Sequence, residues 1–377
     1  MNIAVNTRLL LKDKLEGIGW FTFESLKRIT TQHPEHHFFF IFDRPFSEEF
    51  VFSDNITPLV QYPPARHPFL YYAWFEFSLP SLLNRLKPDL FLSPDGFLSL
   101  RYKGKSMNVI HDLNFEHYPE DLPFLTRRYY RHYFPKYAQK AVRIATVSEY
   151  SRQDIVSQYH VNEDKIDIVY DGANEIYKPL TEEEKVMTRQ FYSDGKPFFL
   201  FIGSLHPRKN LSNLFRAFDL FKKTNPSDVQ LLIVGARKWW TPEIDLSYQR
   251  MIYSRDVVFT GRLNIEHLRY VLGAATALTY VSYFEGFGIP IVEAFRCGTP
   301  VITSDVTSMP EVAGDGALLV DPFDPETIAM AMYKIYQYKT MREELVLRGH
   351  AREGLFTWQN TADRLWESIE KALKTNC

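Results

Sequence analysis

The chain contains 377 residues, of which 45% are hydrophobic and 24% are charged, an ordinary composition for a globular protein. This length exceeds what one small hydrophobic core supports, so we expect two domains. The 44 basic and 46 acidic residues give a net charge of −2. This balance excludes the basic footprint of a nucleic-acid-binding protein, and we expect no nucleic-acid partner.

The cysteines indicate a reducing compartment. Only Cys297 and Cys377 are present, and they form neither a Cys-x-x-Cys motif nor a disulfide framework. The chain opens with a strand pattern, Met1–Asn6, rather than with a basic and apolar leader. No apolar run is long enough to cross a bilayer. We therefore expect a cytoplasmic protein.

Short apolar runs alternate with longer helical patterns in the first half of the chain. The predicted strands are Ile3–Asn6, Phe38–Phe42, Ile56–Val60, Leu90–Ser93, Met107–Ile110, Ile144–Val147 and Ile166–Val169. The predicted helices lie near Gly19–Thr31, Phe69–Leu86, Leu125–Lys140 and Ser151–Tyr159. This alternation is typical of a parallel sheet covered by helices on both faces.

The same pattern restarts after a segment with little strand character, Tyr177–Lys196, which we interpret as a linker. The predicted strands of the second half lie at 196–203, Gln230–Val234, Val257–Thr260, Ala275–Val281, Pro300–Thr303 and Ala317–Val320. A helix is predicted near 210–223, and a last amphipathic helix near 358–374. The fold class is therefore α/β, with two doubly wound, Rossmann-like domains. Such folds bind ligands outside the carboxyl ends of their strands.

One such strand end, Tyr280–Ala294, carries two carboxylates, Glu285 and Glu293, with seven residues between them. The apolar run Ala274–Val281 predicts a buried strand, and Pro290–Cys297 predicts a helix. Glu285 should therefore lie in the loop and Glu293 on the first helical turn. Backbone N–H groups at this helix N-terminus could form an anion site. A plain turn, with Glu293 complementing the helix dipole, is the alternative.

Another strand end in the second half, Gly203–Asn210, places Arg208 and Lys209 at the start of a helix. Cations are unfavourable at this end because it is already partly positive. The pair is explained if it shares an anion such as a diphosphate with the free N–H groups. A solvated pair is the alternative.

Three strand ends of the first half complete the candidates. Gly17 and Gly19 form a Gly-x-Gly loop after the first strand, which lacks the third glycine of a dinucleotide fingerprint and most often means only a turn. His111 should emerge where the strand Met107–Ile110 stops. Ser148 is predicted to cap the next helix.

Several motifs are absent. The sequence has no Walker loop, no His-Glu-x-x-His, no Gly-x-Ser-x-Gly and no Asp-x-Asp. No carboxylate pair is therefore predicted to hold a divalent metal against a nucleotide diphosphate, and we expect neither a metal nor a cofactor. Arg208, Lys209 and helix N-termini would have to bind that charge.

Taken in order, these motifs resemble a known family closely. They are the Gly-Ile-Gly loop, His-Asp-Leu at 111–113, Val-Ser-Glu-Tyr-Ser at 147–151, Arg-Lys-Asn at 208–210, the Glu-seven-Glu element at 285–293 and Cys-Gly-Thr-Pro-Val at 297–301. The chain resembles the retaining glycosyltransferases of family 4, which have the two-domain GT-B fold, over nearly its whole length. Val281 and Asp171 depart from the usual proline and asparagine.

The resemblance implies domains at 1–180 plus a C-terminal helix, 357–377, that returns to the first domain, and at 181–356, with a central cleft between the domains. It also implies roles for the candidate residues. Arg208 and Lys209 hold the donor diphosphate, Glu293 binds the ribose hydroxyls, and Glu285 and His111 face the donor sugar. Backbone groups of Gly17, Gly19, Gly286, Phe287, Gly288 and Ile289 approach the sugar and phosphates.

The expected reaction is the metal-independent transfer of a hexose from a nucleotide diphosphate sugar to a hydroxyl of a glycan or lipid-linked acceptor, with retention. The run His111–Glu120 and the helix after it resemble bacterial mannosyltransferases of surface polysaccharides, which implies GDP-mannose. UDP-sugars (of glucose, galactose or N-acetylglucosamine), a nucleotide-sugar epimerase and an inactive sugar-nucleotide-binding scaffold remain alternatives.

The predicted helix near Leu125–Lys140 mixes basic and aromatic residues between positions 127 and 136. Two interpretations remain open. The helix either packs its aromatic rings inward and solvates its cations, or rests peripherally on an anionic membrane that carries a lipid-linked acceptor.

Overall fold

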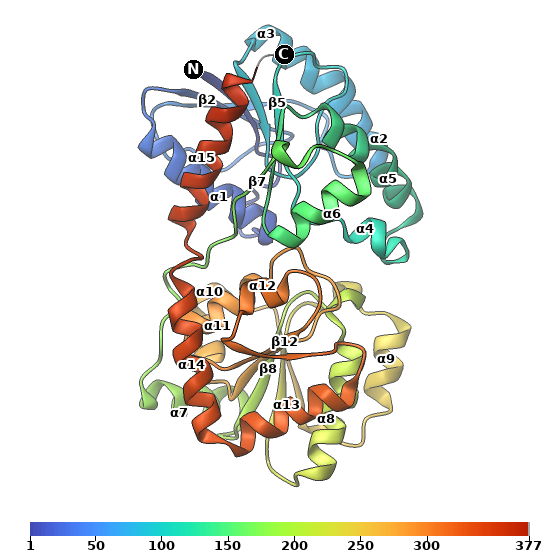
Figure 1. Cartoon of the computed structure of the whole chain (residues 1–377), viewed down its shortest axis with the longest axis vertical. Coiled ribbons are helices and arrows are strands. Elements are labelled where there is room, and N and C mark those ends of the chain that lie inside the picture. Colours follow the sequence, from blue (N-terminus) through green and yellow to red (C-terminus); the bar gives the residue numbers. More distant parts are fainter. Residues whose placement is uncertain (376–377) are drawn as a thin grey trace. The chain divides into compact units, whose positions relative to one another are not determined.

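The computed structural model describes residues 1–375 and divides into two compact units (Figure 1). The first unit comprises Met1–Gly172 and the last helix, and the second comprises Ala173–Thr357. The division falls after Gly172 rather than after residue 180, so residues 173–180 belong to the second unit. The last helix returns to the first unit, as the resemblance implies.

The first unit is built on a seven-stranded sheet of parallel strands in the order β3-β2-β1-β4-β5-β6-β7. The strands are β1 (Asn2–Asn6), β2 (His37–Phe42), β3 (Ile56–Val60), β4 (Leu90–Ser93), β5 (Ser106–Val109), β6 (Arg143–Thr146) and β7 (Ile166–Ile168). The central strands are almost wholly buried, and β1 and β4 are mostly apolar, as expected for a parallel sheet with both faces covered.

Helices cover this sheet. They are α1 (Gly17–Gln32), α2 (Pro68–Ala73), α3 (Leu79–Leu86), α4 (Asn114–His117), α5 (Phe124–Lys140), α6 (Glu149–Tyr159) and α15 (Trp358–Lys374). Buried residues of α3, α5 and α6 share one apolar cluster with the sheet, and α1 packs against α15. The predicted helix 69–86 is interrupted by a π-helical segment, Trp74–Ser78, between α2 and α3.

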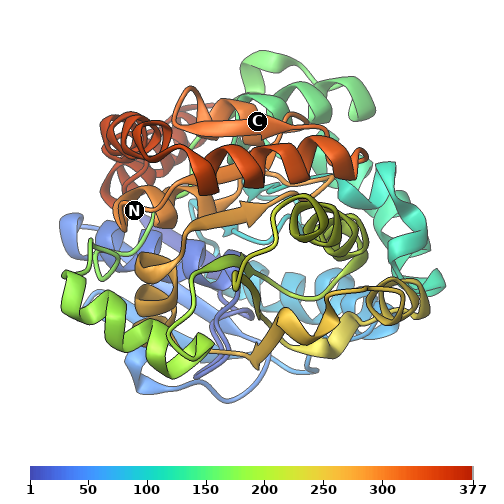
Figure 2. The ribbon, with the colours of Figure 1, turned by 90° about the horizontal axis from the view of Figure 1, so that it is seen from below.

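The second unit has a six-stranded parallel sheet in the order β10-β9-β8-β11-β12-β13. Its strands are β8 (Phe198–Ile202), β9 (Gln230–Val234), β10 (Val257–Gly261), β11 (Ala277–Tyr280), β12 (Val301–Ser304) and β13 (Ala317–Val320). Its helices are α7 (Glu182–Ser193), α8 (Leu211–Thr224), α9 (Pro242–Gln249), α10 (Ile265–Ala274), α11 (Ile289–Arg296), α12 (Met309–Ala313), α13 (Pro325–Gln337) and α14 (Lys339–Glu353) (Figure 2). Helices α8 and α13 pack together on an apolar cluster.

The prediction of a linker at Tyr177–Lys196 is wrong, because most of this segment is helix α7 of the second unit. The side chain of Thr181 accepts a bond from the backbone N–H of Glu184, and the Glu184 carboxylate accepts one from the backbone N–H of Thr181. This capping box satisfies two backbone donors at the helix start. Its Thr-x-x-Glu pattern is visible in the sequence, so the helix was predictable.

Both sheets confirm the predicted fold class of two Rossmann-like domains with parallel sheets. In each sheet the strand order reverses beside the first strand: β1 lies between β2 and β4, and β8 lies between β9 and β11. Ligands of this fold class bind at such a switch point, where the two strand-end loops diverge. In the described residues, no helix combines the length and apolar character needed to cross a membrane.

Candidate active site

The structure brings Arg208, Lys209 and Glu285 together at the switch point of the second sheet. Arg208 and Lys209 follow β8, and Glu285 follows the neighbouring strand β11. Nη1 of Arg208 lies 2.6 Å from Oε2 of Glu285, and Nζ of Lys209 pairs with Oε1. Glu285 and Lys209 are buried, whereas the Arg208 side chain is 24% exposed. The two cations and one carboxylate leave a net charge of +1, which suits an anionic ligand.

The Glu285 carboxylate is ionised. Burial by itself would raise its pKa, but the charges and hydrogen bonds of Arg208 and Lys209 outweigh burial and hold the pKa at about 2. Burial and the Glu285 charge raise the pKa of Tyr280. The neutral Tyr280 hydroxyl accepts a bond of 2.6 Å from Nζ of Lys209 and contributes a hydrogen bond to Glu285. Tyr280 was not predicted as a partner of the cluster, because a buried aromatic residue on a strand has no distinguishing sequence pattern.

Backbone conformation fixes the basic pair. Residues Pro207–Lys209 form one 3-10 turn, and Asn210 adopts a left-handed conformation with φ of 61° before α8 begins. The Asn210 side-chain amide donates to the carbonyls of Val281, at 2.9 Å, and Pro322, at 2.6 Å. The pair therefore precedes α8 by one turn instead of standing on it, and Asn210 fastens it to the loop after β11.

The glycine loop between Glu285 and α11 is fixed by Ser308, whose hydroxyl donates to the carbonyls of Glu285, at 2.9 Å, and Phe287, at 3.0 Å. Gly288 has φ of 105° and forms the N-cap of α11, a conformation that favours glycine. Pro290 has no N–H, and the N–H of Ile291 bonds to the Gly288 carbonyl at 3.0 Å. The amide of Ile289, the first residue of α11, is therefore positioned for a ligand.

Glu293 lies later in α11 than predicted, and its side chain contacts a tyrosine. Counting from Ile289, it begins the second turn of α11, and the first turn contains no acidic residue. Its carboxylate is hydrogen-bonded to the buried Tyr177. Burial raises the pKa of Glu293 to about 7, although the Tyr177 hydrogen bond opposes this rise. Tyr177, at the edge of the expected linker, gave no sign of this contact in the sequence.

His111 lies two residues beyond β5 in the first unit. Nε2 of His111 is 2.8 Å from the carbonyl oxygen of Pro94, which can only accept, so Nε2 carries the proton and Nδ1 is left as an acceptor. The ring contacts Phe21 edge-on at 4.9 Å. Burial lowers the pKa of His111, outweighing the opposing effects of the Pro94 carbonyl, Asp112 and Asp95. A neutral imidazole with one acceptor nitrogen suits a sugar hydroxyl.

The predicted glycine loop is the first turn of α1. Gly17 is the first helical residue and Gly19 the third, after the N-cap Glu16. A side-chain carbon at Gly17 would meet no atom within 4 Å, whereas one at Gly19 would lie 3.2 Å from the carbonyl oxygen of Leu9. Gly17 therefore leaves the helix N-terminus open to a ligand, and Gly19 is required for packing. The predicted cap at Ser148 is confirmed, because its hydroxyl accepts from the N–H of Ser151 at 3.0 Å.

A buried ion pair that was not predicted lies at the switch point of the first sheet. Nε of Arg8, after β1, lies 2.5 Å from Oδ2 of Asp95, after β4. The guanidinium lies 4.4 Å from the ring centroid of Phe97. Asn6 donates a bond of 2.9 Å to the other oxygen of Asp95. This network fixes the ends of β1 and β4, and β4 is the neighbour of β5, which precedes His111.

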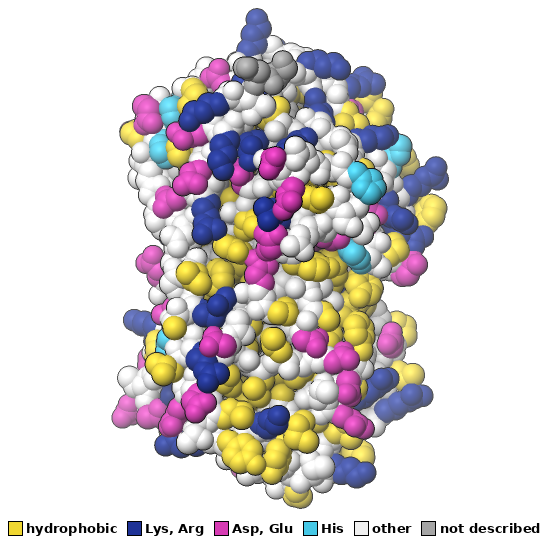
Figure 3. Space-filling view, viewed as in Figure 1, with side chains coloured by type: hydrophobic (Ala, Val, Ile, Leu, Met, Phe, Trp, Pro, Cys, Tyr) yellow, Lys and Arg dark blue, Asp and Glu magenta, His cyan; other side chains and the backbone are white. Residues whose placement is uncertain are grey.

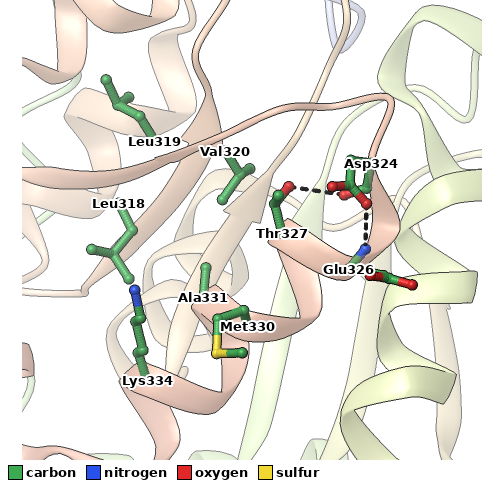
Figure 4. Close-up of a pocket in the computed structure, with 9 residues that line it drawn as sticks. All are labelled: Leu318, Leu319, Val320, Asp324, Glu326, Thr327, Met330, Ala331 and Lys334. Atoms are coloured by element: carbon green, nitrogen blue, oxygen red, sulfur yellow. Dashed lines mark hydrogen bonds between the residues drawn. The ribbon is translucent and has the colours of Figure 1, made fainter.

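A hollow of 410 Å³ lies elsewhere, between β13 and α13 (Figure 4). Its lining includes Leu318, Val320, Met330 and Lys334, and none of the predicted site residues.

Two family models match the chain. The model described as Glycosyltransferase Family 4 matches residues 16–175, and the model described as Glycosyl transferases group 1 matches residues 183–352. The O-antigen chain mannosyltransferase B of Escherichia coli is 30% identical over 279 residues, which cover 74% of this chain and 73% of that protein.

Solved structures share the fold. A sucrose-phosphate synthase from Thermosynechococcus elongatus aligns with a TM-score of 0.79 at 19% identity, covering 98% of each chain. HepE from Anabaena, solved in complex with UDP-glucose, aligns with a TM-score of 0.75 at 16% identity, covering 98% of this chain and 100% of that one. The chain therefore belongs to glycosyltransferase family 4 and is a glycosyltransferase of the GT-B fold.

Proposed function

We propose that this enzyme transfers mannose from GDP-mannose to a hydroxyl of a glycan or lipid-linked acceptor, with retention of configuration and without a metal ion. The observation that carries the transfer chemistry is the cluster of Arg208, Lys209 and Glu285, which has a net positive charge beside a helix N-terminus. The mannosyl donor is supported by the named activity of the Escherichia coli relative. That name also supports a role in O-antigen synthesis.

The cationic pair acts on the leaving group. As the bond between sugar and phosphate lengthens, negative charge accumulates on the departing diphosphate. Arg208 and Lys209 stabilise this charge more strongly in the transition state than in the bound donor. Glu285 keeps both cations in place and would have to yield part of their hydrogen bonding to the phosphates. This interaction can take the place of a divalent metal.

The remaining residues bind the donor. Glu293 accepts from the ribose hydroxyls, and His111 offers Nδ1 to a sugar hydroxyl. The acceptor attacks from the face that the diphosphate leaves, and its proton passes to that diphosphate. This route retains the anomeric configuration without a covalent enzyme intermediate.

The proposal is tested by incubating the purified chain, after chelator treatment, with GDP-mannose, UDP-glucose, UDP-galactose or UDP-N-acetylglucosamine. Each donor is offered with and without a mannose-terminated oligosaccharide. We expect only GDP-mannose among the four donors to react, with release of GDP that depends on the acceptor. The new anomeric proton signal of the product in NMR should match the anomeric configuration of the donor. Faster turnover of a UDP-sugar would overturn the donor assignment. Activity that requires added Mg²⁺ would overturn metal independence.

A UDP-sugar transferase is the second candidate, because HepE binds UDP-glucose on the same fold. The same assay separates the two candidates. Conversion of a UDP-sugar without an acceptor would instead indicate an epimerase, and binding without any turnover would indicate a scaffold.

We further propose that α5 contacts an anionic membrane that carries the acceptor. Its buried aromatic residues, Tyr129, Phe134 and Tyr137, pack inward. Phe124 and Leu125 are 61% and 44% exposed, beside a hollow of 440 Å³ lined by Phe124, Arg127, Arg128, Arg131 and His132. Arg127 and Arg131 are paired with glutamates, which weakens the surface charge. We expect the chain to co-sediment with phosphatidylglycerol vesicles in a salt-sensitive way, and we expect the variant Arg128→Glu/Arg131→Glu to lose this binding. Equal sedimentation of the variant would show that this face of α5 does not bind the membrane.

A further inference from the structure

Three metal-ligating side chains lie together on the turn between α1 and β2. Nε2 of His36 is 3.2 Å from Oε1 of Glu35, and Nδ1 of His33 is 3.6 Å from the same oxygen. All three ligand atoms lie within 4.8 Å of one another. Ligands bound tetrahedrally at about 2.0–2.1 Å are separated by about 3.3 Å. Two of the three separations already fit one shared ion.

The backbone of this turn is fixed. The N–H of His36 donates to the carbonyl of His33 at 3.2 Å. The side-chain amide of Asn55 donates to the carbonyl of His33 at 3.2 Å and to that of His36 at 3.0 Å. The backbone that carries the two histidines is therefore held in place before any ligand arrives, which lowers the entropic cost of binding.

Both imidazole rings also stack on Trp366 of α15. The ring centroids of His33 and Trp366 are 3.8 Å apart, and those of His36 and Trp366 are 5.1 Å apart. Trp366 is buried, and the His33 and His36 side chains are 24% and 14% exposed. The carboxylate of Glu370, one helical turn beyond Trp366, acts electrostatically on His36. Figure 3 shows histidine side chains at the surface of the first unit, in cyan at the upper left.

From this arrangement we infer that His33, Glu35 and His36 bind one divalent transition metal of the Zn²⁺ class. Two imidazoles and a carboxylate are ligands that Zn²⁺ accepts, and water can fill the fourth position. Nε2 of His36 is the nitrogen that faces Glu35, and Nδ1 lies 3.3 Å from the amino nitrogen of Met1. Binding at Nε2 requires its proton to leave, and affinity therefore rises with pH.

The metal stabilises the fold and takes no part in the transfer reaction. The turn precedes the amino end of β2, whereas the candidate residues of this unit follow the carboxyl ends of β1 and β5. The two sites therefore lie at opposite ends of the strands of the same parallel sheet. A bound ion would join the end of α1, through the stacked rings, to α15, which is the segment that returns from the second unit. The inference is independent of the proposed donor and reaction.

The inference is tested on the full chain without an affinity tag, treated with chelator and desalted. ZnCl₂ is titrated at pH 7.5 by isothermal calorimetry. We expect one saturable site, and an affinity about 100-fold lower in His33→Ala/His36→Ala. Glu35→Gln, which keeps both stacked rings, should lower the affinity about tenfold. The exposed His67→Ala serves as the matched control and should bind as the unchanged chain does.

Trp366 provides a second readout. Cu²⁺ at this site should quench Trp366 fluorescence, and Trp366→Phe should lose that part of the quenching while still binding Zn²⁺. No saturable Zn²⁺ binding up to 1 mM, or equal binding by the unchanged chain and both ligand variants, would overturn the inference. Where the double histidine variant does not fold, Glu35→Gln alone decides.

Discussion

Lys209 contacts Tyr280 in two ways. Its Nζ donates a hydrogen bond of 2.6 Å to the tyrosine hydroxyl, and the same ammonium lies 4.7 Å from the centroid of the ring. Lys209 lies in the turn after β8, and Tyr280 ends the adjacent strand β11. Their contact places the cation beside Glu285 in a buried setting. The tyrosine thus orients a charge that proposed catalysis requires.

Tyr280→Phe tests this relationship. The variant keeps the aromatic ring beside Lys209 and removes only the hydroxyl. The Lys209 ammonium therefore loses one hydrogen-bond acceptor, and its side chain becomes more mobile. We expect kcat to fall about tenfold, because a single hydrogen bond to a charged group contributes about 1.5–3 kcal/mol. The Tm should fall by only a few degrees, because Lys209 keeps its ion pair with Glu285. Steady-state kinetics against Tyr283→Phe, a neighbour on the following loop, gives the comparison. An unchanged kcat would show that the hydroxyl has no positioning role.

Removal of the cationic pair should be far more severe. In Arg208→Ala/Lys209→Ala the departing diphosphate loses both charge-assisted donors, and we expect kcat/KM to fall at least about 10²–10³-fold. Arg216→Ala/Lys223→Ala removes two cations from α8 and should retain full activity. Turnover within a few fold of the unchanged enzyme would refute the role of the pair. Circular dichroism checks that the variant, with Glu285 unpaired, still folds.

Glu293 should make donor binding pH-dependent. Its pKa is raised to about 7, so below pH 7 the carboxyl is protonated and accepts poorly from ribose hydroxyls. We expect KM for the donor to decrease as pH rises from 6 to 8. Because the Tyr177 hydrogen bond opposes the rise in pKa, Tyr177→Phe should move the midpoint to higher pH.

Glu293→Gln provides the control, since an amide does not titrate. Its donor KM should be high and independent of pH over this range. A pH dependence that persists in Glu293→Gln would assign the titration to another group. The measurement is the initial rate at several donor concentrations for each pH.

His111 should act as a neutral acceptor. Asparagine places its side-chain oxygen near the position of Nδ1, whereas phenylalanine fills the space without an acceptor. We expect His111→Asn to retain more activity than His111→Phe, with the latter reduced about 10²-fold. Equal losses in the two variants would mean that the ring only fills space. Because burial lowers the His111 pKa, activity should not rise when the pH falls below 6.

Asp171 should destabilise the fold progressively as pH rises. It is buried, its Oδ1 has no hydrogen-bond partner among the described residues, and burial raises its pKa to about 8. When the pKa of a carboxyl group is higher in the folded than in the unfolded chain, raising the pH makes the fold less stable. The loss of stability runs from the pKa in the unfolded chain, about 4, to the pKa in the folded chain. Asp171→Asn removes this titration.

As the pH rises from 5 to 8, the Tm of the Asp171→Asn variant should therefore increase relative to the Tm of the unchanged chain. Thermal unfolding at several pH values measures it, with Asp194→Asn, at the exposed end of α7, as control. A Tm difference that does not vary with pH would show that Asp171 is not the titrating group.

Sequence periodicity predicted nearly every strand within one or two residues, because buried parallel strands are short continuous apolar runs bounded by turn residues. Two helical segments were not predicted correctly. The capping box of α7 lies in a Glu-rich segment that was interpreted as a linker. The interruption between α2 and α3 also escaped, because Trp74–Ser78 keeps an apolar pattern that does not distinguish a π-helix from an α-helix.

The sequence by itself determined the two-domain α/β class, the family and the positions of Arg208, Lys209, Glu285, Glu293 and His111 at strand ends, since these depend on local order along the chain. Only the tertiary structure decided the partners. Lys209 meets Tyr280 and Glu285, Glu293 meets Tyr177, and Arg8 meets Asp95, because segments distant in sequence become neighbours in the fold. The ionisation of these groups was likewise decided by folding, since burial and neighbouring charges, rather than residue type, set their pKa values.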